Sequence, residues 1–217
     1  MHKPKIGILG SGMVGKTLAE GFVKQGHLVK IASRKPMLLQ DFVTKIGKGI
    51  TAGDFRETAD YGEIIIICVK GIEYEEAITL AGKENFLKKI VMDVTNPLLF
   101  EEAGRAPVLE ASYPDSNGVL IQNLLPKSYV VKIFNSVPAP YMINPVLNQG
   151  VPTLFMCGND PSAKKTVREL AHAFGWKDIV DIGEIKEAYI LEALAMLWIK
   201  YGFDTNTWVH AFTLLRK

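Results

Sequence analysis

The chain opens on the stretch that decides its fold, Lys5-Ile6-Gly7-Ile8-Leu9-Gly10-Ser11-Gly12-Met13-Val14-Gly15-Lys16-Thr17. The apolar residues before Gly10 predict a β-strand, and the glycines that follow predict a tight turn. Val14, Leu18 and Phe22 recur at every fourth position, so a helix should begin directly after the turn and end at Gly26. A turn aimed at a helix N-terminus presents free backbone N–H groups and the positive end of the helix dipole. The stretch therefore predicts an anion site, usually for phosphate.

Two phosphate-binding motifs overlap in this stretch. Gly10–Gly15 fits G-x-G-x-x-G, the dinucleotide motif, whose glycines allow the turn, the approach of a pyrophosphate and the packing of helix on strand. Gly10–Thr17 also fits G-x-x-x-x-G-K-T, the nucleoside-triphosphate loop, in which Lys16 would reach the phosphates and Thr17 would hold magnesium. These eight residues are compatible with both motifs, so the rest of the chain must discriminate between them.

The composition describes an ordinary globular protein of 217 residues, with 48% hydrophobic and 22% charged residues. A net charge of +2 gives no basic footprint for nucleic acid. The first apolar run is too short and glycine-rich for a signal peptide, and the apolar segment 188–199 is interrupted by Glu192 and too short to span a membrane. We therefore expect a cytoplasmic protein with neither nucleic-acid nor membrane partners.

The cysteines and histidines suggest no metal site. Cys68 and Cys157 each fall inside an apolar, strand-like run, where a buried thiol packs as a small hydrophobic group. The four histidines lack the spacing of metal ligands.

Predicted strands and helices alternate along the chain, which is typical of an α/β fold: a doubly wound, mostly parallel Rossmann-type sheet with helices on both faces and a small helical C-terminal region. Strands are expected at residues 27–32, 49–52, 63–70, 90–94, 129–134, 153–157 and 178–182. Helices are expected at residues 37–46, 55–61, 73–80, 119–125, 161–174 and from 185 onward, the last in two pieces broken near Gly202. Residues 98–114 show no period and are expected to form a loop.

Ligands of such sheets bind at the carboxyl ends of the strands. Five of these ends could share one cleft: Gly10–Gly15, Ser33–Lys35, Val69–Lys70, Thr95–Pro97 and Asn135–Ala139.

The end of the second strand discriminates between the two motifs. A triphosphate hydrolase needs an acidic residue after an apolar strand, and Asp93 could supply it. In a dinucleotide fold, however, the second strand ends beside the adenosine ribose, where a carboxylate selects NAD. Here that end carries Ser33, Arg34 and Lys35, and an arginine can bind a 2′-phosphate with its fork of donors. An ordinary basic turn is the alternative interpretation of these three residues. Together with the predicted strand–helix–strand order, however, they favour NADP binding. Lys16 and Thr17 are then left without a special role.

The chain resembles the NADP-dependent oxidoreductase family of the archaeal enzyme that passes hydride between NADP and the deazaflavin coenzyme F420. It is also similar to the soluble domain of the six-transmembrane metalloreductases. The resemblance covers the whole chain and rests on the segments Ile6–Gly15, Ser33-Arg34, Val69-Lys70, Asp93–Pro97 and Val131–Ala139. The glycine motif is common to many dehydrogenases, whereas Phe134–Ala139 together with Ser33-Arg34 is more specific.

The resemblance implies that residues 10–14 hold the pyrophosphate, Ser33 and Arg34 hold the 2′-phosphate, and a second ring system stacks at residues 135–139. The expected cofactor-binding residues are Gly10, Ser11, Gly12, Met13, Val14, Gly15, Ser33, Arg34, Lys35, Val69, Lys70, Asn96 and Pro97. The expected substrate-binding residues are Asn135, Val137, Pro138 and Ala139. Residues 1–140 would form the NADP-binding Rossmann domain, and residues 141–217 the sheet extension and C-terminal helices that complete the acceptor cleft. The loop 100–115 matches no part of the family, which leaves the acceptor open.

Hydride transfer between a nicotinamide and a flavin-like ring needs positioning rather than a strong acid or base. The predicted strand ends offer no histidine–carboxylate pair, so no catalytic side chain is expected. The acceptor would be coenzyme F420 or a flavin as co-substrate. Two alternatives remain: a small-substrate dehydrogenase or imine reductase of the β-hydroxyacid type, with Lys186 or Lys200 as candidate catalytic lysine, and a non-catalytic NADP-binding sensor.

The C-terminal region is apolar on more than one side. Its large apolar residues are Ile185, Tyr189, Ile190, Leu194, Leu197, Trp198, Tyr201, Phe203, Trp208, Phe212 and Leu215. They either extend the core or meet a second copy of the chain across a two-fold axis. The family resemblance also suggests a homodimer.

Overall fold

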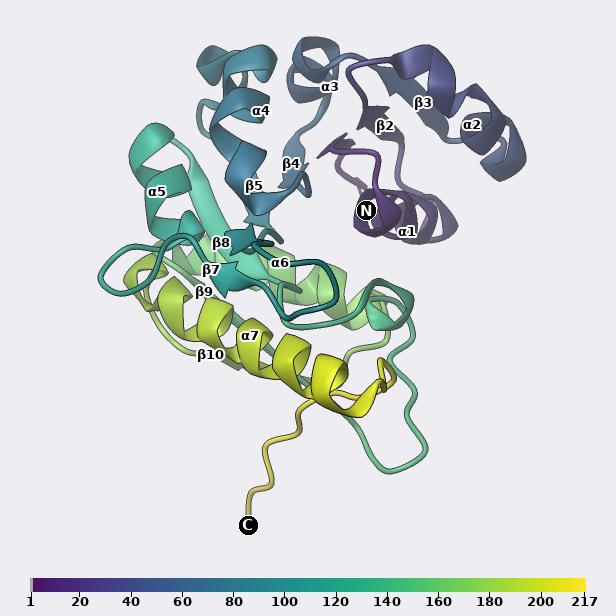
Figure 1. Cartoon of the computed structure of the whole chain (residues 1–217). Coiled ribbons are helices and arrows are strands. Elements are labelled where there is room, and N and C mark those ends of the chain that lie inside the picture. Colours follow the sequence, from purple (N-terminus) through teal and green to yellow (C-terminus); the bar gives the residue numbers. More distant parts are fainter. Residues whose placement is uncertain (1) are drawn as a thin grey trace.

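The computed structural model describes residues 2–217 and is built on one eight-stranded sheet (Figure 1). The strand order is β10-β9-β8-β5-β4-β1-β2-β3. All neighbours run parallel except β8 and β9, which are antiparallel. The strands are β1 (Ile6–Leu9), β2 (Val29–Ala32), β3 (Ile50–Gly53), β4 (Ile64–Ile67), β5 (Ile90–Asp93), β8 (Tyr129–Ile133), β9 (Thr153–Gly158) and β10 (Asp178–Asp181). The six strands from β1 to β8 have the Rossmann order 3-2-1-4-5-6, so the predicted fold class is confirmed.

Helices cover both faces of this sheet (Figure 1). One face packs against α1 (Met13–Lys24), α2 (Gln40–Ile46) and α6 (Pro161–Ala173). The other face packs against α3 (Phe55–Tyr61), α4 (Tyr74–Ala81), α5 (Asn117–Leu124) and α7 (Ala188–Thr205). In β4 all four isoleucines are buried, with Ile64 and Ile66 in one core and Ile65 and Ile67 in the other. A central parallel strand covered on both faces accounts for this continuous apolar run.

The C-terminal region differs from its prediction. Residues 188–205 form one helix, α7, which continues through Gly202, so the expected break into two helical pieces is wrong. The helix ends at Asn206, whose φ of 50° turns the chain back, and residues 206–217 contain neither helix nor strand. A methyl group at Gly202 would lie 2.6 Å from the Trp208 ring. The glycine therefore makes room for an aromatic ring and does not end the helix.

The segment expected to be a loop at residues 98–114 contains a small hairpin. Its strands β6 (Leu98–Leu99) and β7 (Val108–Leu109) pair antiparallel. The hairpin lies beside α7 (Figure 1), and the rings of Tyr113 and Tyr189 meet at 5.1 Å between centroids.

The boundary expected at residue 140 falls between β8 and β9. Val131 and Gly158 pair across it within the same sheet.

Candidate functional site

The glycine-rich turn joins β1 to α1 at the carboxyl end of the sheet. Gly10 has φ of +124°, and a methyl group there would lie 2.7 Å from the Cys68 carbonyl oxygen. A methyl group on Gly15 would lie 2.1 Å from the Gly10 carbonyl oxygen, so this glycine lets the helix pack closely on the turn. A methyl group on Gly12 would meet no atom within 4 Å. Gly12 therefore keeps an open approach to the helix N-terminus.

A cleft of about 430 Å³ begins at this turn. It is lined by the turn, by the ends of β2 and β4, and by Phe55 and Glu73. The expected cofactor-binding residues that line it are Gly10, Ser11, Gly12, Met13, Val14, Ser33, Arg34, Val69 and Lys70. Gly15 is buried beneath the turn, and Lys35 is exposed outside the cleft, its backbone N–H donating to the Ser33 Oγ at 3.1 Å. We call this space the cofactor cleft.

The free N-terminus of α1 suits an anion. Its N-cap, Gly12, supplies no side-chain cap, and the first amide of the helix that bonds back is Lys16 N–H, to Gly12 O at 3.0 Å. The preceding amides are thus left for a ligand. At the far side of the cleft the Arg34 side chain is 65% exposed. Its guanidinium lies 4.0 Å from the Glu76 carboxylate, too far for a hydrogen bond, so its donors are available to a ligand. These residues fit a dinucleotide that carries a phosphate near Arg34.

The same geometry does not suit a triphosphate loop. The Lys16 ammonium lies over the Phe42 ring, 5.5 Å from the ring centroid, rather than over the glycine turn. Asp93, the candidate magnesium ligand, is fully buried and paired with Lys132 at 2.7 Å. The lysine of the triphosphate motif and the candidate acidic residue are therefore both engaged elsewhere.

A second, mostly apolar pocket of about 490 Å³ adjoins the cofactor cleft. Met13 and Val14 line both spaces. The remaining lining comes from the ends of β5 and β8, from α7 and from Trp208, and includes the predicted residues Asn96, Asn135, Val137, Pro138 and Ala139. Pro97 does not line it but is buried against Gly71. We call this space the acceptor pocket, and none of its lining residues is charged.

Two asparagines hold the inner wall of the acceptor pocket. The Asn96 side-chain amide donates to the Asn135 carbonyl oxygen at 2.7 Å, and the Asn135 amide donates to Asn96 Oδ1 at 2.8 Å. The Asn135 amide also donates to the carbonyl oxygen of Leu191 at 2.8 Å. The ends of β5 and β8 are thereby tied to each other and to α7.

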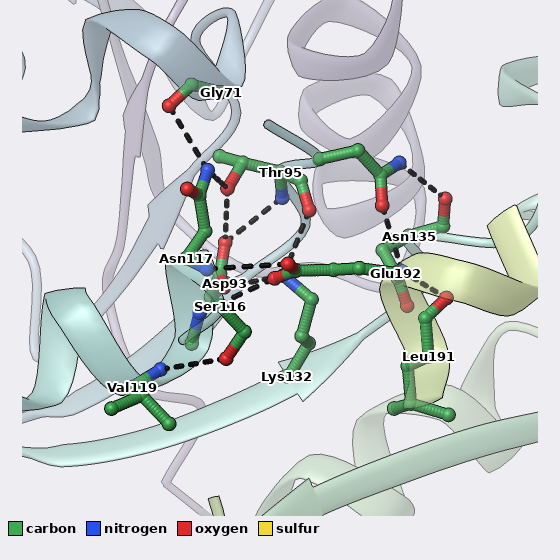
Figure 2. Close-up of polar contacts among 12 residues, drawn as sticks. Gly71, Asp93, Thr95, Ser116, Asn117, Val119, Lys132, Asn135, Leu191 and Glu192 are labelled. Carbon is green, nitrogen blue, oxygen red and sulfur yellow. Dashed lines mark hydrogen bonds and ion pairs between the residues drawn. The ribbon is translucent and has the colours of Figure 1, made fainter. Parts of the chain in front are cut away.

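A buried ionic cluster lies directly behind this wall (Figure 2). The Lys132 ammonium uses three donors: it binds Asp93 Oδ2 at 2.7 Å, the Thr95 carbonyl oxygen at 2.8 Å and Glu192 Oε1 at 2.8 Å. The carboxylate of Glu192 also accepts from the amides of Asn117 and Gly118, at the N-terminus of α5. The cluster therefore joins β5, β8, α5 and α7 below the acceptor pocket.

The charges of this cluster are unequal, because one ammonium faces two carboxylates. Burial alone would lower the pKa of Lys132, but Asp93 and Glu192 outweigh it and hold that pKa above its ordinary value. Burial, together with the repulsion from Asp93, raises the pKa of Glu192. The Glu192 carboxyl is therefore easier to protonate than an ordinary glutamate.

Sequence reasoning missed the roles of Lys132, Glu192, Trp198 and Trp208. One signal was available for the first two: a lysine inside an apolar strand and a glutamate inside an apolar helix. Charged residues are almost never fully buried unless they are paired. For the two tryptophans, the chain gave no local signal that they would meet at one pocket.

The candidate catalytic lysines lie outside both spaces. The Lys186 side chain is 70% exposed and pairs with Glu184 at 3.0 Å, and Lys200 is exposed and pairs with Asp204.

Among residues 2–217 the structure contains no cluster of side chains able to hold a metal ion. Within that same range, no helix is both long and apolar enough to cross a membrane.

Comparison with known proteins gives a consistent result. A family model described as NADP oxidoreductase coenzyme F420-dependent matches residues 5–97. The crystal structure of a candidate F420-dependent NADP reductase from Arthrobacter sp. FB24 superimposes with a TM-score of 0.93 at 32% identity, covering 99% of this chain and 100% of that chain.

Two curated relatives extend the comparison. The F420-dependent NADP reductase of Methanocaldococcus jannaschii is 29% identical over 206 residues, which cover 90% of this chain and 91% of that protein. Metalloreductase STEAP3 of Rattus norvegicus is 30% identical over 193 residues. That match covers 89% of this chain but only 36% of the metalloreductase, so the chain spans about a third of its length.

Proposed function

Because this chain belongs to the family of coenzyme F420-dependent NADP oxidoreductases, we propose that it transfers hydride between NADP(H) and a planar acceptor such as the deazaflavin coenzyme F420 or a flavin. Family membership makes the chain an NADP-dependent oxidoreductase. The acceptor, and the residues that bind the cofactor and the acceptor, are the parts that we propose.

The cofactor cleft supports NADP as the dinucleotide. The amides at the N-terminus of α1 would hold the pyrophosphate, with Gly12 leaving room for its approach. Arg34 and Ser33 would hold the 2′-phosphate, because an exposed guanidinium can form charge-assisted hydrogen bonds with it. Val69 and Lys70 would line the path toward the nicotinamide, and Asn96 would lie at its far end.

The observation that carries the proposal is the acceptor pocket. It shares Met13 and Val14 with the cofactor cleft, and its lining is mostly apolar, without a charged side chain. An acidic small substrate would find no cation there, whereas a flat aromatic ring gains from burial against Val137, Pro138 and Trp198.

This arrangement acts by positioning. When bound, NADPH would supply a hydride, and the acceptor ring would take up that hydride and one proton from water. The buried cluster below Asn96 and Asn135 holds the wall of the pocket in place, and the apolar lining excludes water from the space between the two rings. No side chain has to act as an acid or base.

The chain's assembly and location belong to the same proposal. We expect a homodimer, in which the exposed apolar side chains of α7, among them Ile190, Leu197 and Tyr201, meet a second copy. We also expect a cytoplasmic protein.

An anaerobic assay of nicotinamide absorbance tests the proposed activity. NADPH should be consumed with coenzyme F420 or with FMN, and NADH should be consumed far more slowly. Consumption with small imines or carbonyl compounds alone would support the dehydrogenase alternative. NADP binding without turnover of any acceptor would support the sensor alternative.

A further inference from the structure

Trp208 reaches the acceptor pocket from outside the sheet. Residues 206–217 follow α7 as an irregular tail that turns back at Asn206. Two positions after that turn, Trp208 lines the acceptor pocket beside Trp198 of α7. The residue is 42% exposed and lines the pocket, so another ring could cover part of its indole.

The position of the Trp208 ring is set by α7. Its six-membered ring lies on Gly202, where an added methyl group would come within 2.6 Å of a ring carbon. The ring also packs against Trp198 at 5.6 Å and edge-on against Phe203 at 5.3 Å between centroids. Glycine costs stability in a helix interior, so its presence here is accounted for by the ring that occupies the space of a side chain.

The tail that carries Trp208 is fastened to the same helix. The Trp198 indole N–H donates to the His210 carbonyl oxygen at 2.8 Å, and His210 Nε2 donates to the Trp198 carbonyl oxygen at 3.0 Å. The two rings stack at 4.6 Å with an angle of 20° between their planes. This reciprocal pair fixes the tail on α7 close to Trp208, and further along the tail Phe212 and Leu214 bind Thr153 of β9.

We propose that Trp208, held on Gly202, is a specificity-determining residue that selects planar aromatic acceptors over aliphatic ones. This inference rests on the proposed function. A half-exposed indole beside an apolar pocket gains most from a flat ring that stacks on it. A small carbonyl compound would cover little of the indole and would gain correspondingly little. Trp208 thus acts on the acceptor and leaves NADP binding, in the separate cofactor cleft, unchanged.

Four variants test the inference by calorimetric titration of the full-length protein. The measured quantities are the Kd of NADP⁺ alone and the Kd of coenzyme F420 or FMN with NADP⁺ present. Trp208→Ala should raise the Kd of the planar ligand roughly tenfold, since aromatic stacking of a base is worth about 1–3 kcal/mol. Trp208→Phe should restore most of the affinity. Gly202→Ala should weaken ring binding in the same direction, because the methyl group displaces the indole. Leu87→Ala, a change at an exposed leucine that lines neither space and lies outside α7, is the matched control.

The outcomes separate this inference from the proposed function. If the wild-type protein binds NADP⁺ but neither planar ligand, the proposed function fails and the inference fails with it. If the wild-type protein binds the planar ligand and the Trp208→Ala variant, folded by circular dichroism, binds it equally well, the inference alone is wrong. Equal losses of NADP⁺ and acceptor affinity would also overturn it, because they indicate a general disturbance of the fold.

Discussion

The ammonium of Lys132 and the carboxylate of Glu192 lie 2.8 Å apart with essentially no exposure to solvent, although one belongs to β8 and the other to α7. This pair fixes α7 against the sheet one turn before Ala195, which lines the acceptor pocket. A buried ion pair is weak evidence for net stability, but the loss of one partner leaves an uncompensated buried charge. The pair is therefore best tested by removing its members one at a time.

Lys132→Met should strongly destabilise the protein, because it leaves Asp93 and Glu192 buried without their cation. We expect the free energy of unfolding in urea to fall by about 3–5 kcal/mol. Lys45→Met, at an exposed position of α2, should change it by no more than about 0.5 kcal/mol. A Lys132 variant as stable as the control would mean that the cluster is not held by its charges.

Glu192 should make stability depend on pH in a defined direction. Burial raises the pKa of Glu192 above its ordinary value of 4.5. The protonated carboxyl therefore contributes its full stabilisation at a pH below 4.5, and this contribution is lost as the pH rises through the folded-state pKa. The free energy of unfolding of the wild type, measured relative to Glu192→Gln, should therefore fall as the pH is raised from about 4 toward neutrality. Parallel stability curves for the two proteins would contradict a raised pKa at this carboxyl.

Gly12 and Gly15 should respond differently to alanine. A methyl group at Gly12 meets no protein atom but projects into the approach to the helix N-terminus, so Gly12→Ala should keep its melting temperature and bind NADP about tenfold or more weakly. A methyl group at Gly15 would lie 2.1 Å from the Gly10 carbonyl oxygen, so Gly15→Ala should lose about 1–3 kcal/mol of stability. Thermal unfolding and NADP titration of both variants measure the two effects. Equal changes in stability and in NADP affinity for the two variants would contradict the separate roles of Gly12 in cofactor binding and of Gly15 in helix packing.

Arg34 should select NADP over NAD. Removing its guanidinium in Arg34→Ala takes away charge-assisted hydrogen bonds worth roughly 1.5–3 kcal/mol, which is about ten- to a hundredfold in the Kd of NADP. The Kd of NAD should change little. Glu76→Gln, which removes the carboxylate 4.0 Å from Arg34, should tighten NADP binding slightly. Equal weakening of both dinucleotides by Arg34→Ala would remove the basis for NADP selection.

Lys16 should be dispensable for the cofactor. Its ammonium lies over the Phe42 ring, so Lys16→Ala should change the Kd of NADP by no more than about twofold, and the protein should hydrolyse neither ATP nor GTP. Magnesium-dependent ATP binding that disappears in this variant would instead support the triphosphate motif.

The local sequence pattern was sufficient to predict the strands, the helices and the glycine-rich turn. The turn at Gly10–Gly15 and the isoleucine run in β4 each encode their structure in residues a few positions apart, since strand and helix periods are short-range properties. Because parallel strands end at one edge, the same reasoning located the residues that line the two spaces, from Ser33 and Arg34 to Asn135.

The sequence by itself determined the strands and helices of the sheet, their order along the chain, and the sheet edge whose residues line the two spaces. The tertiary structure alone decided that Lys132 meets Glu192, that α7 continues through Gly202, and that Trp208 turns back to the acceptor pocket. The physical reason is the range of the interactions. A charged residue inside an apolar segment indicates that an oppositely charged partner is needed, and a glycine inside a helix indicates a loss of helix stability that some contact must offset. Which distant carboxylate or aromatic ring makes that contact depends on how α7 and the tail after it pack against the sheet.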